Sequence, residues 1–434
     1  MHKIIALLIL FGCAANGLQM TLDLGLIGAS APKLRVRESP VRGLEAVQKL
    51  SKGEVAIRVP RSLVLEITDL DAKPKDDLLL SALQWRELDW EGRLAATLLA
   101  VQKNTASISE HKKWFDSLPE SYDEIPAVGW TDKEIIELGY APVTEAIEIQ
   151  RQKWDKIIQV LIESGLAPSK EKAMWAIATV RSRSFSGPLE STGTAKQRIL
   201  LLGFALWLAA GYVIFDLGSI DQAIQGLTLA VFSAIIADLF SAQFLSDDND
   251  VSTPKRHCLA PGIDLANHRG DATNQISTEY FQDHLSLSAE QDLNPGQEFY
   301  TTYGAKSNAN LLVNFGFIEI DNPNDDYVFP EDFQHLSFLR ARRVTRTGFP
   351  EDVARSVLNA NQGDNIKAAK LLADACDAAA EDLLSSSASS SSSSNDNLRP
   401  AAALTLALRT EHAKLLRDLA NLTRRTPPVI AHSR

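Results

Sequence analysis

Two short polar motifs carry the residue types that could do chemistry in this chain. An Asn-His pair, Asn267 and His268, stands about 35 residues before a Tyr-Gly pair, Tyr303 and Gly304. The chain alternates around Tyr303 as a strand does, and the segment AKSNANLL that follows is typical of a helix start. No metal-ligand spacing, phosphate loop or Ser/His/Asp set competes with them. Polar groups on irregular backbone beside a phenol suit methyl transfer, which depends mainly on alignment of the reactants.

These motifs resemble those of the SET-domain protein methyltransferases. The resemblance is strongest to the branch typified by the Rubisco large-subunit lysine methyltransferase, which also includes relatives that methylate histidine. The residues that fit the motifs of this branch are Pro261, Asp264, Asn267, His268, Tyr303, Ser307, Asn308 and Gly316. Segments 41–66, 111–130 and 181–186 also resemble the branch, so the resemblance covers about 33 to 434 with one large interruption.

The resemblance implies roles for individual residues. Tyr303 matches the phenol beside the transferring methyl and the attacking nitrogen, and we expect it to be the catalytic residue. The residues expected to bind S-adenosylmethionine are Val41, Arg42, Gly43, Arg183, Asn267 and His268, and those expected to bind the substrate are Asp264, Tyr280, Tyr303 and Phe315. Two assignments stay open, because the RSRSF register allows Arg181 in place of Arg183, and Asp264 could instead cap the following turn.

Three positions depart from the family pattern. Val41 stands where the cofactor loop usually has the first Gly of Gly-x-Gly, which predicts altered backbone contacts and reduced cofactor affinity. Phe315 replaces a tyrosine, so a hydroxyl that would bond the amine or its water is missing, which predicts room for further methylation. Gly187 stands where the Rubisco enzyme often has a second Arg, which weakens the inference that Rubisco is the substrate.

The bulk composition favours a globular protein with a protein partner. With 434 residues, 45% hydrophobic and 23% charged, the chain can form one large or two ordinary domains. Its net charge of -11 disfavours nucleic-acid binding, because neutralisation of phosphates drives most of that affinity. A basic protein segment is a more natural partner. Three cysteines without a CxxC pair exclude a disulfide scaffold and a cysteine-based zinc site, and we expect no metal.

Two apolar stretches bear on targeting and membranes. Residues 1–20 have a short basic start, an apolar run and small residues, the outline of a signal or targeting segment. Residues 198–241 contain two uncharged runs, each near the lower length limit for crossing a bilayer, and such a pair returns the chain to the side it left. A membrane hairpin, a buried helical hairpin and an aberrant gene-model segment all stay open. The compartment stays open too, between a plastid and endomembranes, with membrane insertion through 198–241 as one outcome.

The expected fold class is α+β. It comprises a SET-type pseudoknotted fold of short twisted β-sheets over 33–318, with a helical insert at about 65–182, and an all-helical C-terminal domain over 327–434. The C-terminal segments carry apolar residues at helical spacing, whereas the serine run at 385–394 predicts a flexible loop. The resemblance implies that this domain holds the protein substrate, and a helical bundle without a binding role is the alternative. We expect a monomer.

The leading interpretation is an S-adenosylmethionine-dependent protein-lysine N-methyltransferase that acts on a non-histone protein. Histidine methylation is the alternative chemistry, since the branch contains both activities. A non-catalytic SET module that binds a peptide at a membrane is the alternative from another class. Val41 and Phe315 motivate that last alternative, whereas the intact Asn267, His268 and Tyr303 count against it.

Overall fold

The computed structural model describes residues 22–38, 41–74, 79–104, 110–122, 127–188, 254–273, 277–279, 283–388 and 400–426. The chain divides into two compact units, the first comprising Met1–Ile67, Asp71–Phe185 and His257–Arg434 and the second Thr68–Leu70 and Ser186–Arg256. The expected leader at 1–20, the expected hairpin at 198–241 and Tyr280 lie outside the described residues. Within the part of the chain that is described, no helix combines the length and apolar character needed to cross a membrane.

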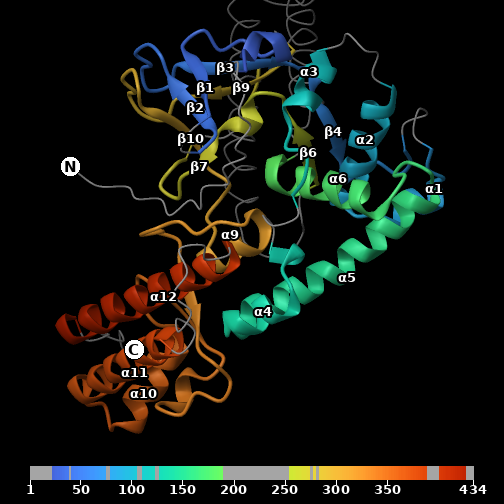
Figure 1. Ribbon diagram of the computed structural model, residues 1–434. Coiled ribbons are helices and arrows are strands. Elements are labelled where there is room, and N and C mark those ends of the chain that lie inside the picture. Colours follow the sequence, from blue (N-terminus) through green and yellow to red (C-terminus); the bar gives the residue numbers. More distant parts are fainter. Residues whose placement is uncertain are drawn as a thin grey trace, which may run out of the picture. The chain divides into compact units, whose positions relative to one another are not determined.

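A four-stranded sheet joins segments that are far apart in the sequence (Figure 1). Its strands, in spatial order, are β1 (Leu34–Arg37), β2 (Gly43–Ala46), β10 (Glu298–Thr301) and β7 (Asn267–His268). β1 pairs antiparallel with β2 and β2 antiparallel with β10, whereas β10 and β7 are parallel. The sheet therefore places the expected cofactor loop, which leads into β2, in the same layer as both polar motifs.

Two three-stranded sheets have the spatial orders β3-β9-β8 and β4-β6-β5. The first is antiparallel and consists of β3 (Val55–Pro60), β9 (His284–Ser288) and β8 (Ser277–Glu279). The second consists of β4 (Leu65–Thr68), β6 (Lys255–Leu259) and β5 (Phe185–Pro188). Short 3-10 turns occur at η1 (Leu24–Ile27), η2 (Arg61–Leu63), η3 (Ala127–Gly129), η4 (Ile263–Leu265) and η5 (Ser337–Leu339).

The region where a helical insert is expected, at about 65–182, begins with β4 and continues as helices. These are α1 (Ala82–Glu87), α2 (Trp90–Asn104), α3 (Glu110–Ser117), α4 (Asp132–Leu138), α5 (Ala141–Glu163) and α6 (Lys170–Arg183). Ser81 with Gln84, and Thr131 with Glu134, form capping boxes that start α1 and α4. Such pairs satisfy N–H groups of the first turn that have no partner within the helix.

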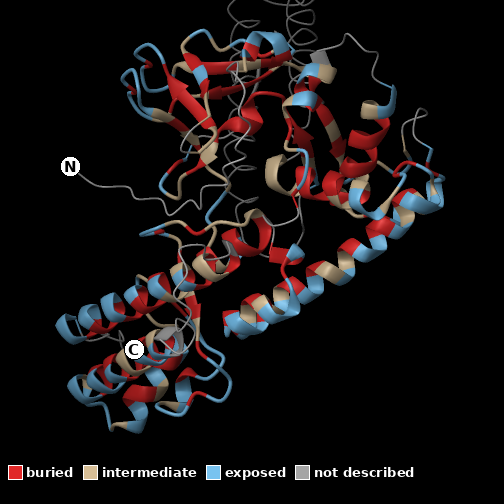
Figure 2. Ribbon diagram, viewed as in Figure 1, coloured by how far each residue is buried: buried red, intermediate tan, exposed pale blue. Residues whose placement is uncertain are grey.

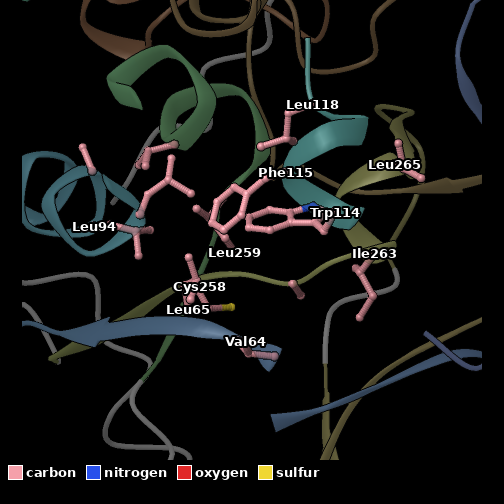
Figure 3. Packing of buried hydrophobic residues seen from close by; sticks show 14 of the residues in the cluster. Val64, Leu65, Leu94, Trp114, Phe115, Leu118, Cys258, Leu259, Ile263 and Leu265 are labelled. Atoms are coloured by element: carbon pink, nitrogen blue, oxygen red, sulfur yellow. The ribbon is translucent and has the colours of Figure 1, made fainter. Parts of the chain in front are cut away.

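A first hydrophobic core contains residues of the sheets and of α2, α3, α5 and α6. Figure 2 shows the buried residues gathered in the strands and on one face of most helices, as amphipathic elements require. Figure 3 shows Trp114 and Phe115 of α3 in the same cluster as Leu94, Leu259 and Ile263. Burying each such side chain contributes roughly 1.5–3 kcal/mol. This packing anchors η4, which precedes the Asn-His motif.

The helix predicted after the Tyr-Gly motif is present as α9 (Asn308–Phe315). Ser307 occupies its N-cap position, and Gly316 ends it with a φ of 74°. That left-handed conformation favours glycine, because a Cβ would be strained there. The rings of Phe315 and Phe317 flank Gly316 with centroids 6.3 Å apart, and they contact the rings of Tyr303 and His268 respectively.

The C-terminal region is mainly helical, with one addition to the expected all-helical domain. Its elements are β11 (Asp326–Val328), β12 (Arg343–Thr345), α10 (Glu351–Ala360), α11 (Asn365–Ala388) and α12 (Pro400–Arg425). β11 and β12 form an antiparallel ribbon. A second hydrophobic core packs these elements with α9 and the N-terminal part of α5. The serine run predicted as a loop begins inside α11, and 389–394 lie outside the described residues.

Candidate active site

Parallel pairing of β7 with β10 brings the two polar motifs together. Asn267 lies opposite Tyr300, and His268 lies opposite Thr301. Just beyond β10, the backbone N–H of Tyr303 donates to Nδ1 of His268 at 3.0 Å. The Asn-His and Tyr-Gly motifs, which the sequence places in separate segments, therefore form one site.

The phenol of Tyr303 is enclosed by a carbonyl group and two rings. Its hydroxyl donates to the backbone oxygen of Ala266 at 3.2 Å. Its ring centroid lies 4.9 Å from that of Phe315 and 5.0 Å from that of His268. Burial raises the pKa of Tyr303 to about 12, so the phenolate is not populated near neutral pH. Because the hydroxyl hydrogen is donated to the carbonyl oxygen of Ala266, the lone pairs of the hydroxyl oxygen are left to accept from another donor.

His268 holds the backbone of Tyr303 with one defined tautomer. Since Nδ1 accepts the Tyr303 N–H, the imidazole proton of the neutral ring lies on Nε2, 3.6 Å from Oε2 of Glu319. The other oxygen of Glu319 accepts the N–H of Gly270 at 2.7 Å. Burial, with the nearby charge of Lys306, lowers the pKa of His268 to about 4. His268 is therefore neutral at physiological pH and acts on Tyr303 by orientation, not by proton transfer.

The expected cofactor loop touches Asn267 directly. Nδ2 of Asn267 donates to the carbonyl oxygen of Arg42 at 3.0 Å. Gly43 leaves no room for a side chain, since a Cβ there would lie 2.6 Å from Nδ2 of Asn267. The glycine thus permits the close approach of this loop to the Asn-His motif, since a Cβ would force the Asn267 side chain to shift. The structure therefore brings together Arg42, Gly43 and Asn267, three of the residues expected to bind the cofactor.

Arg183, at the end of α6, is tied to the turn that precedes β7. Its Nη1 lies 3.1 Å from Oδ2 of Asp264, and its Nε donates to the hydroxyl of Tyr122 at 3.0 Å. Burial alone would lower the pKa of Arg183, but the contacts with Tyr122 and Asp264 outweigh it and raise that pKa. The guanidinium group is therefore permanently charged and held by two partners from different elements.

Both carboxylate oxygens of Asp264 are used within the protein. Oδ2 also accepts from Nε1 of Trp114 at 3.2 Å, and Oδ1 accepts the N–H of Gly262 at 2.8 Å. The bond to Gly262 closes the turn that leads into η4, which is a structural role, although it involves the preceding residues and not the following turn. Its contact with a substrate stays a prediction.

Arg181, the other candidate for the arginine of the site, has different partners. It contacts Glu91, which is fully buried in α2, and Asn314 of α9. Two residues further along α6, Arg183 lies beside Asp264 and close enough to Tyr303 to affect its pKa. The structure therefore favours Arg183 as the arginine that faces the site.

Arg42 is a second positively charged side chain near Arg183, and the neighbouring Val41 forms a hydrogen bond through its backbone. Nη1 of Arg42 donates to the carbonyl oxygen of Ser117 at 2.6 Å. Burial lowers the pKa of Arg42, and although Glu38 opposes this, the charge of Arg183 acts in the same direction as burial. Each guanidinium group already has a carboxylate partner, Glu38 for Arg42 at 3.2 Å and Asp264 for Arg183 at 3.1 Å. The carbonyl oxygen of Val41 accepts from Nε of Arg37 at 3.3 Å.

Motif comparison missed Glu298 and assigned Tyr122 and Trp114 only to the scaffold of the insert. Glu298 accepts a hydrogen bond from Asn267 at 2.8 Å, and the two aromatic residues position Arg183 and Asp264. A signal for Glu298 existed in the segment GQEFY, because residues i and i+2 of a strand share a face. Glu298 shares a strand face with Tyr300, and Tyr300 lies opposite Asn267 on the neighbouring strand. The carboxylate of Glu298 is therefore a candidate hydrogen-bond partner for Asn267.

None of the family models compared with the chain matches it. Protein SET DOMAIN GROUP 40 of Arabidopsis thaliana is 23% identical over 303 residues, which are 67% of this chain and 52% of that protein. The Actin-histidine N-methyltransferase of Drosophila melanogaster is 40% identical over 68 residues, 15% of this chain and 12% of that protein. The chain thus spans about half of the Arabidopsis protein and a small part of the other.

The fold is similar to a crystal structure of the SET domain of LSMT bound to lysine and AdoHcy. The TM-score is 0.51 at 16% sequence identity, covering 91% of this chain and 87% of the other. This likeness confirms the predicted fold class, a SET-type arrangement of short sheets followed by C-terminal helices. Together with the Arabidopsis protein, it confirms the resemblance to SET-domain protein methyltransferases.

Proposed function

We propose that this chain is an S-adenosylmethionine-dependent protein methyltransferase that modifies a lysine of a non-histone protein. The observation that carries the proposal is the convergence of Gly43, Asn267, His268 and Tyr303 through the neighbouring strands β2, β10 and β7. A packed SET domain without this convergence would support only the alternative of a peptide-binding module.

The residues of the site suit S-adenosylmethionine. In the described part of the chain, no donor bonds to Oδ1 of Asn267, which leaves an acceptor for an α-ammonium group. Arg42 and Arg183 supply positive charge for an α-carboxylate, a role that suits guanidinium groups. When bound, the cofactor supplies a methyl group carried on a sulfonium sulfur. Gly43 allows the loop backbone to lie close to it.

The walls of the site explain how the target amine would be activated. A lysine in water has a pKa of about 10.4 and is almost wholly protonated at neutral pH. The rings of Tyr303, Phe315 and Phe317 form an apolar surface that disfavours the charged form and so promotes loss of its proton to solvent. The hydroxyl oxygen of Tyr303 then accepts an N–H bond from the neutral amine and directs its lone pair to the methyl group.

Histidine methylation is the second candidate. The observation in its favour is the 40% identity of a short segment to a protein named as an Actin-histidine N-methyltransferase. Lysine is preferred because the structure with a similar fold over nearly the whole chain is bound to lysine.

The C-terminal helices are proposed to hold the protein substrate, and the enzyme is proposed to act as a monomer.

The test is transfer of isotope-labelled methyl groups from S-adenosylmethionine into proteins of a lysate, mapped by mass spectrometry. We expect Tyr303→Phe to lower the rate about 10²- to 10³-fold, the usual effect of losing one positioned hydrogen-bonding group, while S-adenosylhomocysteine still binds. Tyr327→Phe is the matched control, because Tyr327 is a buried tyrosine of β11 in the second core. Label that maps to histidine would favour the second candidate. Equal labelling by wild type and Tyr303→Phe would overturn the proposal.

A further inference from the structure

Glu298 on β10 collects three hydrogen-bond donors from three directions. Its Oε1 accepts from Nδ2 of Asn267 at 2.8 Å. Its Oε2 accepts from Nη2 of Arg37 at 2.5 Å and from the hydroxyl of Tyr300 at 2.8 Å. The side chain is 11% exposed, so these bonds are largely shielded from water. Only a carboxylate offers two acceptor oxygens and no donor, which is what three donors require.

This contact decides which end of the Asn267 amide points away from Glu298 and Arg42. The amide has two neighbours on the protein side, the carbonyl oxygen of Arg42 and the carboxylate of Glu298, and both can only accept. The NH2 group must therefore point to them, using both of its hydrogens. Oδ1 is left on the other side, as an acceptor. The orientation follows from the chemistry of the two acceptors.

Gly43 locks the same arrangement from the strand side. A Cβ at position 43 would lie 2.6 Å from Nδ2 of Asn267 and 2.9 Å from Oε1 of Glu298. The two groups therefore pack directly on the backbone of β2, where neither can turn aside without losing its partner. The Asn267 amide is held by the cofactor loop and by β10 at once.

We infer that Glu298 is a positioning residue for the cofactor. By holding the NH2 group of Asn267, it keeps Oδ1 directed at the α-ammonium group of S-adenosylmethionine. The inference rests on the proposed function for the identity of the ligand, but it concerns binding and not methyl transfer. It adds to the motif residues a carboxylate that no motif comparison assigned.

The substitution Glu298→Gln has a specific expected consequence. A glutamine has one acceptor oxygen, for which Arg37 and Asn267 compete, and the charged donor forms the stronger bond. The NH2 group of the new glutamine then meets the NH2 group of Asn267, so the Asn267 amide keeps only its bond to the carbonyl oxygen of Arg42 and is no longer held from two sides. Oδ1 is then no longer held toward the α-ammonium group, and we expect affinity for S-adenosylhomocysteine to fall about tenfold to one-hundredfold.

The experiment measures binding of two ligands to the full chain by titration calorimetry. One is S-adenosylhomocysteine, and the other is its analogue without the α-amino group. Wild type should prefer the complete ligand, because only that ligand can bond Oδ1 of Asn267. Glu298→Gln should lose most of that preference and keep its affinity for the deaminated analogue within about threefold, since a general loss of structure would weaken both ligands equally.

Glu45 provides a matched control. It lies on β2 directly opposite Glu298, it is also 11% exposed, and it pairs with Arg35 at 2.7 Å. Glu45→Gln removes a comparable carboxylate from the same sheet without touching Asn267, and it should leave both affinities unchanged. If Glu298→Gln does not fold, Glu298→Asp keeps the charge but draws the carboxylate back by one methylene. It should then lower only the affinity for the complete ligand.

Each outcome separates this inference from the proposed function. If wild type prefers the complete ligand and Glu298 variants keep that preference, the inference is wrong and the function stands. If wild type binds S-adenosylhomocysteine with the predicted dependence on Glu298 but transfers no methyl, the inference stands and the function is wrong. If wild type binds neither ligand, both are overturned.

Discussion

At the scale of single residues, His268 and Tyr303 are both held in their neutral forms. Burial lowers the pKa of His268 to about 4 and raises that of Tyr303 to about 12. Between those limits neither side chain changes its charge. The two residues therefore act by geometry, through the bond from the Tyr303 N–H to Nδ1 and the bond from the Tyr303 hydroxyl to Ala266. A general base is not needed if the substrate arrives deprotonated.

This neutrality predicts how the rate depends on pH. Because kcat/KM reports groups of the free enzyme and free substrate, a lysine substrate should give values that rise about tenfold per pH unit from pH 6 to 9.5. A histidine substrate should instead give values that level off above about pH 6.5. The measurement is kcat/KM for methylation of the identified substrate across that range. An additional ionisation in the profile of kcat/KM between pH 6 and 9, caused by a group of the enzyme, would contradict the neutral assignment of His268.

At the scale of elements, α12 is joined to the rest of its unit through an aromatic cluster around His412. The imidazole lies 4.8 Å from the ring of Tyr140 and 5.4 Å from that of Tyr327, centroid to centroid. Tyr140 directly precedes α5, and its hydroxyl accepts the N–H of Val328 in β11 at 2.9 Å. One buried histidine thus contacts both the helical insert and the C-terminal ribbon. Burial, with the charge of Arg346, lowers the pKa of His412 to about 3.

We expect His412→Phe to flatten the dependence of stability on pH. The folded pKa of His412 lies below its unfolded value of about 6.5, so its contribution is fully present above about pH 6.5 and is lost as pH falls toward 3. At about 1.4 kcal/mol per pH unit, wild type should lose about 2 kcal/mol more than the variant between pH 7 and 5. Denaturant unfolding at both pH values measures this difference.

Comparing wild type with His412→Phe cancels the contributions of other titrating groups to the pH dependence of stability. Burial raises the pKa of Asp325 to about 6, which acts in the opposite direction, since its contribution is present below about pH 3.8 and is lost as pH rises through 6. Asp325 is present in both proteins, so its contribution cancels. Equal losses of stability in wild type and His412→Phe would show that His412 is not the group responsible.

At the scale of the whole molecule, the apolar stretch at 198–241 is an insertion between two neighbouring strands. It is preceded by β5 and followed by β6, which lie next to each other in the sheet β4-β6-β5. The cost of closing a loop grows only slowly with its length, so a long insertion between these strands can be changed in length at little cost in stability. The insertion is therefore separable from the site in principle, and its location in a membrane stays a proposal, as does a plastid or endomembrane compartment.

Replacing 191–252 by a short Gly/Ser linker should leave binding of S-adenosylhomocysteine unchanged. If the stretch is a membrane hairpin, the full chain should stay with membranes after carbonate washing, and the shortened chain should not. Removal of 389–394 serves as the control, because it deletes a polar segment instead and should not alter partitioning. Extraction of the full chain by carbonate would contradict the hairpin, and loss of ligand binding by the shortened chain would make the stretch part of the fold.

The fold class was predicted from the resemblance of the two motifs to those of the SET-domain protein methyltransferases, because periodicity alone predicts only a mixture of helix and strand with a helical C-terminus. The helix after Tyr303 and the helical character of the C-terminal region were predicted from patterns within a few residues, such as AKSNANLL or apolar residues at helical spacing. Only the tertiary structure decided between Arg181 and Arg183, gave Asp264 its turn-closing bond and revealed Glu298. Each of these contacts requires a strand or helix to pair with a distant one. Such pairing is a property of the packed chain, and local propensity carries no record of it.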